Sequence, residues 1–334
     1  MTASESIRVG FLVFPGFPMS CLTSMIEPFR VANEVSGQKV FAWTLISESG
    51  GRVTSSADVA FEPDLTLAEV EKLDQLFVLS GPASNFDDLR AGEGKLRRLA
   101  RFGVTMGAIS GGIFPLARAG LLEDAEISVH WCYAAAFQAE FPDLTATESV
   151  IALAGKRITA SGAAAAFDLA LHIIQDAVGA HVATEVACWF QHPMVRGQGV
   201  LQRKPTPSAT CTDDMLPEIL RVATEIFETH VEDPVRISDV AKATGVSSRQ
   251  LERLFRQSTG MSPLQYYRSI RMKAARQLVL YSNDRLLDIA VAVGYNSSGA
   301  LVHNYQEVFD VHPLEDRRKI NLFRVEKNAV LPQA

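Results

Sequence analysis

The chain has few cysteines and no long hydrophobic run. Its four cysteines, Cys21, Cys132, Cys188 and Cys211, stand far apart, without a Cys-x-x-Cys pair or a Cys/His cluster. This spacing argues against a disulfide framework and against a structural metal. The N-terminus lacks a basic segment followed by an apolar stretch and a cleavage site, and no apolar run is long enough to cross a bilayer. We therefore expect a reduced, cytoplasmic, soluble protein without a metal, a cofactor or a membrane partner.

Net positive charge is lacking as well. The chain has 32 Lys and Arg against 38 Asp and Glu, a net charge of −6, which by itself disfavours nucleic acid as a partner. The balance is uneven, however, because residues 236–280 contain nine basic and only two acidic side chains. A local basic segment of this kind is what phosphate contacts need. The charge pattern therefore favours a DNA-binding segment within an otherwise acidic protein.

One helix-turn-helix pattern occurs twice between residues 236 and 319. Each copy has an Asp, a β-branched residue and an Ala ahead of a Gly, followed by a Leu, an aromatic residue and a Pro. The matched pairs are Asp239/Asp288, Val240/Ile289, Ala241/Ala290, Gly245/Gly294, Leu251/Leu301, Phe255/Tyr305 and Pro263/Pro313. A repeated helix pair is a signal at the level of the whole fold, and this unit is one that binds nucleic acid.

The second helix of each copy is the expected reading element. In the first copy Gly245 stands where a tight turn needs a positive φ, and Ser247 or Ser248 can cap the helix that follows. Such a helix fits the major groove, with residues near its N-terminus at the base edges. We expect Arg249 and Arg253 to supply most base-specific hydrogen bonds. The outward-facing residues predicted to contact DNA are Ser248, Arg249, Glu252, Arg253, Ser298, Gly299, Val302 and His303.

Residues 214–320 resemble the AraC/XylS DNA-binding domain, in which a long helix joins two helix-turn-helix units. The resemblance is closest over residues 255–268 and 271–278. The second copy departs at its end, where Asp310 replaces the usual Gly and Asp316 replaces an expected aromatic residue. We therefore expect the second unit to depend more on phosphate contacts and DNA shape than on base edges.

The first 190 residues alternate short apolar runs with helical patterns. Strands are predicted at 7–14, 41–46, 76–80, 104–109 and 157–160, and helices at 20–32, 94–102, 131–140, 162–178 and 181–191. This order predicts a doubly wound, flavodoxin-like α/β domain with a parallel sheet. Residues 196–213 have linker composition, so we expect an α/β domain over 1–195 and an all-α domain over 214–334.

One strand-to-helix junction is a candidate site. Ser110 ends a buried strand and precedes Gly111-Gly112 and a helix, which is the arrangement of a nucleophile elbow; ligands of open α/β sheets bind at such strand ends. With this junction, residues 7–190 resemble the class I glutamine amidotransferase-like superfamily, in its PfpI branch as found in GlxA-type regulators. The further matching motifs are Phe14-Pro15-Gly16, Ile26-Glu27-Pro28-Phe29, Leu116–Leu122, His130-Trp131 and Ala160–Ala163.

The resemblance implies a binding site rather than a catalytic one. Enzymes of the superfamily use cysteine at the position of Ser110, and no obvious carboxylate orients His130; a hydrolase or amidase acting through Ser110 is the alternative. The motif at Glu27-Pro28 resembles that of regulators that sense betaine, carnitine or arginine. A zwitterion would place its carboxylate at a helix N-terminus and its cation against aromatic faces or a carboxylate. The expected ligand-binding residues are Ser110, Gly111, Gly112, Glu27, Phe17, His130 and Trp131.

Together these patterns predict a transcriptional regulator, with activation favoured over repression. Its first domain senses a small metabolite and its second binds double-stranded promoter DNA through two reading helices. The resemblance further implies a homodimer, with RNA polymerase as a candidate partner.

Overall fold

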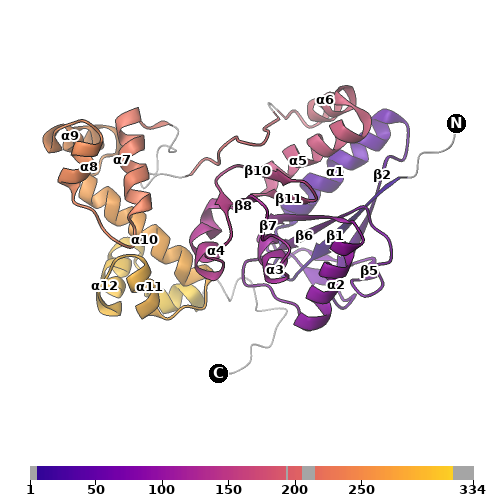
Figure 1. The fold of residues 1–334 in the computed structure, drawn as a ribbon, viewed down its shortest axis with the longest axis horizontal. Coiled ribbons are helices and arrows are strands. Elements are labelled where there is room, and N and C mark those ends of the chain that lie inside the picture. The colour runs from indigo at the N-terminus through magenta and orange to yellow at the C-terminus, as the bar shows by residue number, and fades with distance from the viewer. Residues whose placement is uncertain (1–5, 193–194, 205–214, 319–334) are drawn as a thin grey trace. The chain divides into compact units, whose positions relative to one another are not determined.

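The computed structural model describes residues 6–192, 195–204 and 215–318 and divides the chain into two compact units (Figure 1). The first unit extends to Gln202, and the second begins at Arg203. Among the described residues, no helix has both the length and the apolar character needed to span a membrane.

The first unit is built on a seven-stranded sheet in the order β10-β11-β7-β6-β1-β2-β5. All neighbours are parallel except β10 and β11. The central strands are continuous apolar runs, as expected for strands that are covered on both faces. The sheet strands are β1 (Ile7–Val13), β2 (Phe41–Ser47), β5 (Leu65–Thr66), β6 (Gln75–Ser80), β7 (Thr105–Ser110), β10 (Ile151–Ala154) and β11 (Arg157–Ala160). Two small ribbons pair β3 (Val53–Thr54) with β4 (Ala60–Phe61) and β8 (Ile127–Ser128) with β9 (Ala146–Thr147).

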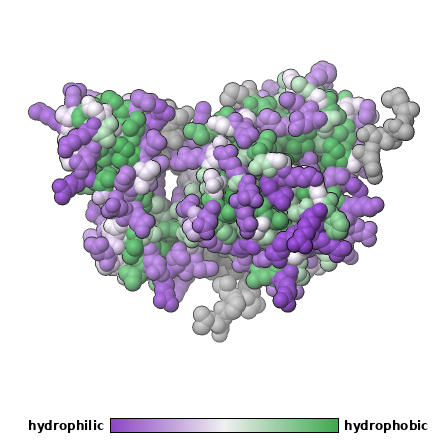
Figure 2. Space-filling model, in the orientation of Figure 1, coloured by the Kyte–Doolittle hydropathy of each residue, from purple (hydrophilic) through white to green (hydrophobic). Residues whose placement is uncertain are grey.

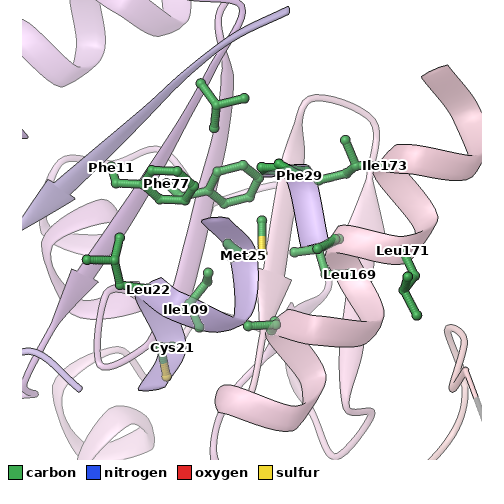
Figure 3. Packing of buried hydrophobic residues seen from close by; sticks show 14 of the residues in the cluster. Phe11, Cys21, Leu22, Met25, Phe29, Phe77, Ile109, Leu169, Leu171 and Ile173 are labelled. Atoms are coloured by element: carbon green, nitrogen blue, oxygen red, sulfur yellow. The ribbon is translucent and has the colours of Figure 1, made fainter. Parts of the chain in front are cut away.

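Helices cover both faces of this sheet, which confirms the predicted doubly wound fold (Figure 1). On one face α1 (Met19–Ser36), α5 (Ala163–Val178) and α6 (Ala180–Trp189) pack together. The others are α2 (Leu89–Arg101), α3 (Ile113–Arg118), the 3-10 turn η1 (Trp131–Tyr133) and α4 (Ala134–Glu140). Side chains of the sheet, α1 and α5 meet in a buried hydrophobic core, which Figure 3 shows: Phe11, Phe77, Met25, Phe29, Leu169 and Ile173.

The second unit consists of helices throughout its described part, as predicted. They are α7 (Glu218–Thr229), α8 (Ile237–Ala243), α9 (Ser248–Thr259), α10 (Pro263–Tyr281), α11 (Leu286–Ala292) and α12 (Ser298–Phe309). The pairs α8/α9 and α11/α12 are the two helix-turn-helix units, and Gly245 and Gly294 have nearly the same φ, 73° and 72°. Of the two serines considered as caps, it is Ser247 that caps α9, in a reciprocal capping box with Gln250.

The long helix α10 connects the two helix-turn-helix units. Its Arg271 donates to the backbone oxygen of Val293 at 2.9 Å and lies 4.3 Å from the ring centroid of Tyr295. Its Tyr267 hydroxyl donates to the backbone oxygen of His230, which lies just before the first helix-turn-helix. Because α10 contacts the segment before α8 and the turn between α11 and α12, the two helix-turn-helix units belong to one packed domain.

The two departures from the AraC/XylS pattern have local explanations. Asp310 adopts the left-handed conformation at the end of α12, with φ 53°, where the first copy has Gly260 at φ 73°. Asp is one of the few residues with a side chain that tolerate this region. Asp316 is buried and accepts hydrogen bonds from Tyr305 and Arg276, so a polar contact replaces the expected aromatic one.

The start of the predicted linker packs on the first unit. Arg196 donates to the buried carboxylate of Asp168 at 2.7 Å, and the Gln202 side chain donates to the backbone oxygen of Val129 at 2.7 Å. Composition did not reveal these contacts, because Gln and Arg suit both a solvated linker and a buried hydrogen-bond network. The later part of that linker, residues 205–213, lies outside the described residues.

Candidate functional site

A cavity of about 280 Å³ lies at the carboxyl-terminal edge of the parallel strands, next to the end of β7. This is the edge at which open α/β sheets bind ligands. Its walls come from the loop after β1, the start of α1, the ends of β6 and β7, the turn η1 and the start of α5. The functional groups that line it belong to Ser20, Cys21, Ser56, Ser110, His130 and Tyr133. No Asp, Glu, Lys or Arg is among the described residues that line it.

Ser110 has the backbone geometry of a nucleophile elbow. It is the last residue of β7 and has a φ of 56°, a strained conformation for a residue with a side chain that is found mainly at functional sites. The next two positions must be glycine, since a Cβ on Gly111 would lie 2.4 Å from the Ser80 oxygen and one on Gly112 would lie 1.8 Å from the Val78 oxygen. The hydroxyl of Ser110 makes no hydrogen bond to another described residue, so it is available to a ligand in the cavity.

His130 lines the same cavity but lacks the partner that a catalytic base needs. Its Nδ1 lies 2.9 Å from the Cys132 sulfur, and it also accepts from the Cys132 backbone N–H. Burial lowers the pKa of His130 below its usual value, because the charged imidazolium loses its hydration. In the described part of the chain no carboxylate contacts His130, whereas the Ser-His-Asp arrangement relies on one.

Several residues predicted to bind the ligand lie elsewhere. Phe17 is fully buried, with its ring edge-to-face on Phe61 at 5.3 Å. Glu27 pairs with Arg30 at 3.0 Å on a half-exposed face of α1, nearly two turns beyond the cavity residues Ser20 and Cys21. Glu27 does not line the cavity, because a motif read along the sequence does not show which face of the helix carries it.

Of the remaining residues predicted to bind the ligand, some line the cavity and others do not. The N–H of Gly112 already donates to the Ile109 oxygen at 3.1 Å, which leaves Gly111 as the glycine amide without an acceptor among the described residues. Trp131 is next to His130 but does not line the cavity. Ser110 and His130 do line it, and sequence reasoning missed Tyr133, which follows His130 on η1.

A larger and more open hollow, of about 790 Å³, lies at the opposite edge of the sheet. It is lined by the amino-terminal ends of β1, β6 and β7 and by charged side chains such as Arg8 and Asp74, which pair at 3.0 Å. Size does not make it the better candidate, because ligands of doubly wound sheets bind at the carboxyl ends of the strands. We therefore take the smaller cavity as the ligand site.

The second candidate surface is formed by the outward faces of α9 and α12. On α9, Ser248, Arg249 and Arg253 are exposed, and Figure 2 shows hydrophilic side chains along the outer edge of the surface where α9 lies, beside a hydrophobic patch. Glu252 instead holds Arg256 at 2.8 Å. On α12, Gly299 and His303 are exposed, whereas Ser298 and Val302 are partly covered. The inward residues of both helices are fully buried: Leu251, Phe255, Leu301 and Tyr305.

The two reading helices thus differ in chemistry. The exposed face of α9 offers two guanidinium groups, which can bind a guanine edge through two hydrogen bonds. The exposed face of α12 offers an imidazole and a stretch of backbone at Gly299. The exposure of Arg249, Arg253 and His303 follows from the helical period once Leu251 and Leu301 are placed inside, and their contacts with DNA stay a prediction.

Comparison with known proteins agrees with both units. A model described as helix-turn-helix domain matches residues 240–319, and the model of the DJ-1/PfpI family matches residues 8–176. The HTH-type transcriptional regulator CdhR of Pseudomonas aeruginosa is 33% identical over 93% of this chain and 92% of its own length. The HTH-type transcriptional regulator GlxA of Rhizobium meliloti is 32% identical over 93% of this chain and 96% of its own.

A solved structure supports the fold of the first unit. The crystal structure of an AraC family transcriptional regulator from Pseudomonas putida superposes with a TM-score of 0.51 at 25% identity, over 55% of this chain and 99% of its own. The relatives extend through both units. The chain therefore belongs to the AraC-type transcriptional regulators whose DNA-binding domain follows a DJ-1/PfpI domain.

Proposed function

We propose that the DJ-1/PfpI domain of this regulator is a sensor without catalytic activity, and that a small metabolite in the cavity at Ser110 controls how the second domain engages promoter DNA. The expected outcome of binding is activation of transcription. The observation that carries the proposal is the Ser110 elbow: among the described residues its hydroxyl has no hydrogen-bond partner, and His130 in the same cavity has no carboxylate partner.

The lining favours a small, compact ligand. Hydroxyl groups of Ser20, Ser56 and Ser110 line the cavity and can donate or accept hydrogen bonds. The N–H of Gly111, next to Ser110 in the chain, has no acceptor among the described residues, although Gly111 itself does not line the cavity. Since Glu27 points elsewhere, a cationic group would rest against the rings of Tyr133 and His130. A betaine-, carnitine- or arginine-like metabolite is the ligand class that this arrangement and the family resemblance support.

On the DNA side, α9 and α12 would enter successive major grooves. One turn of the double helix separates such sites by roughly 34 Å. We propose that Arg249 and Arg253 read guanine edges and that the α12 face contributes phosphate and shape recognition. A homodimer would place two such domains on paired sites, with RNA polymerase as the further partner of an activator.

Thermal denaturation of the full chain tests the ligand. A ligand that binds only the folded state raises its melting temperature, so betaine, carnitine, dimethylglycine and arginine are titrated separately. At least one should raise the melting temperature of the wild type and of a Ser49→Ala control on the exposed surface, and the shift should be lost in Ser110→Ala. The absence of any shift with all four compounds would exclude this ligand class.

Hydrolase or amidase activity is the alternative that the elbow geometry favours. It predicts that amide and ester substrates disappear over time with the wild type and not with Ser110→Ala. A sensor predicts unchanged substrate together with the loss of the melting-temperature shift in the same variant. The two outcomes separate catalysis from binding at one hydroxyl.

A further inference from the structure

Gln202 is the last residue of the first unit, and its side chain is buried there. Only 7% of the residue is exposed, which is unusual for a residue in a segment of linker composition. Its backbone N–H donates to the Glu148 oxygen at 2.9 Å, and the N–H of Val150 donates to the Val200 oxygen at 2.7 Å. An antiparallel bridge joins Leu201 to Ser149. Residues 200–202 therefore lie as a short extra strip along residues 148–150.

The Gln202 amide binds both peptide groups that flank His130. Its Nε2 donates to the Val129 oxygen at 2.7 Å, and its Oε1 accepts the N–H of Trp131 at 2.9 Å. Nε2 also lies 3.4 Å from the Ser149 oxygen. A primary amide is suited to this role because one planar group offers both a donor and an acceptor. One side chain thus fixes the backbone on both sides of a cavity residue.

The ring of His130 is positioned by this backbone and by its contacts with the residues of η1. Its Nδ1 contacts Cys132, and the ring centroid lies 5.5 Å from that of Tyr133, which also lines the cavity. A ligand that displaces either ring must therefore move the turn that Gln202 holds. Leaving a buried polar group unpaired costs free energy. A movement of η1 must therefore either carry Gln202 with it or break the hydrogen bonds between them at a cost in free energy.

We infer that Gln202 is a positioning residue for His130 and couples the occupancy of the cavity to the chain that leaves the first unit. The next residue, Arg203, already belongs to the DNA-binding unit. Ligand binding shifts η1, the Gln202 contacts rearrange, and residues 200–202 change their hold on the first unit. The coupling rests on the proposed function of the cavity, but the Gln202 contacts can be tested without a ligand.

The test compares the full-length wild type with Gln202→Ala, Gln202→Glu and a control, Gln138→Ala. Gln138 is an exposed residue of α4 whose amide bonds only to the nearby Pro142 oxygen. Hydrogen exchange measures the N–H of Trp131, and binding to a duplex selected by the wild type from a random library measures DNA affinity. In Gln202→Ala the Trp131 N–H should exchange at least about tenfold faster, and DNA affinity should change by about fivefold or more.

Gln202→Glu retains the acceptor for Trp131 but loses the donor to Val129, so Trp131 should stay more protected than in the alanine variant. The control should change neither quantity. Faster exchange at Trp131 with unchanged DNA affinity would make Gln202 a merely structural contact, and unchanged exchange would remove the positioning role. Either result overturns the inference whether or not a ligand is found.

An arm on the unmodified chain distinguishes the two proposals. With saturating betaine, carnitine, dimethylglycine or arginine, a compound that raises the melting temperature should also change exchange at residues 200–202. If none of them binds, the proposed ligand class is wrong, and the Gln202 variants still test whether Gln202 couples the cavity to DNA affinity. If one binds and exchange at 200–202 stays the same, the sensor proposal survives and the coupling through Gln202 is wrong.

Discussion

The hydroxyl of Tyr305 donates a hydrogen bond of 2.7 Å to Asp316 in the interior of the second helix-turn-helix. The same carboxylate accepts from Arg276 of α10 at 2.8 Å, and the guanidinium lies 4.6 Å from the Phe309 ring centroid. Burial and the Asp316 carboxylate raise the pKa of Tyr305 well above its usual value, which keeps the phenol protonated as the donor. This cluster joins the last described turn of the domain to the end of α12 and to the connecting helix.

Removing the acceptor should destabilise the second unit more than removing the donor. Tyr305→Phe leaves Asp316 paired with Arg276 and should lower the free energy of unfolding by about 1 kcal/mol, whereas Asp316→Ala leaves the buried Tyr305 hydroxyl unpaired and should lower it by about 2–3 kcal/mol. All three tryptophans, Trp43, Trp131 and Trp189, are in the first unit. The urea midpoint measured by circular dichroism of the helices should therefore shift. The urea midpoint measured by tryptophan fluorescence, which reports on the first unit, should stay the same.

The duplicated turn provides a matched pair of glycine substitutions. Gly245 and Gly294 share a left-handed conformation, but a Cβ on Gly245 would meet nothing within 4 Å. A Cβ on Gly294 would lie 2.7 Å from Pro234 and 2.8 Å from the Glu232 oxygen. Gly245→Ala should cost only the backbone strain, about 1–2 kcal/mol, and Gly294→Ala should cost more. Equal urea midpoints for the two variants would show that Pro234 shifts to accommodate the added methyl group without a measurable loss of stability.

Sequence reasoning succeeded where a period or a repeat fixes the answer. The helical period placed Leu251 and Leu301 inside and therefore Arg253 and His303 outside, and the repeat located both turns. It was less informative where a motif assigned a role without showing which face of the helix carries the residue. Glu27 was assigned to the ligand by a motif, yet its partner is Arg30 on the same helix.

Irregular segments were harder still. The edge strand β10 went unpredicted because four residues, half of them alanine, give little apolar pattern. Gln202 was assigned to the linker because no local sequence pattern shows that its amide bonds to Val129 and Trp131, more than seventy residues earlier. Such contacts are set by tertiary packing, which a local reading cannot contain.

The reading role of α9 predicts a change in sequence preference. Arg253→Ala should weaken binding to the selected duplex by about 1–3 kcal/mol and relax the preference at one base pair. Selection from a random library, carried out side by side for the wild type and the variant, measures both quantities. Arg90→Ala, an exposed arginine of α2 in the first unit, is the control and should keep the full preference. A variant that selects the same consensus as the wild type would contradict base reading by Arg253.

Two arginines at matched positions of the repeat should contact phosphates instead. Arg236 and Arg285 immediately precede α8 and α11, both are exposed, and in the described chain neither guanidinium forms an ion pair. The first helix of a helix-turn-helix crosses the DNA backbone. Each alanine substitution should weaken binding about equally for all sequences and reduce the salt slope of the binding constant by about one unit. A slope that stays constant in both variants would remove these contacts.

Burial of His130 predicts an acid-sensitive first unit. Its pKa lies below the usual value in the folded protein because burial disfavours the charged ring, whereas the unfolded chain takes up the proton at about pH 6.5. Below that pH His130 is protonated in the unfolded state and still neutral in the folded state. His130 therefore lowers the free energy of unfolding as the pH drops toward the folded pKa. His130→Gln should remove that contribution, and the urea midpoint by tryptophan fluorescence should then lose less between about pH 7.5 and 5.5 than in the wild type. His181→Gln, at a side chain that is 86% exposed, should behave like the wild type. If both histidine variants respond to acid as the wild type does, water reaches the His130 ring and the cavity is more open than the packing around η1 implies.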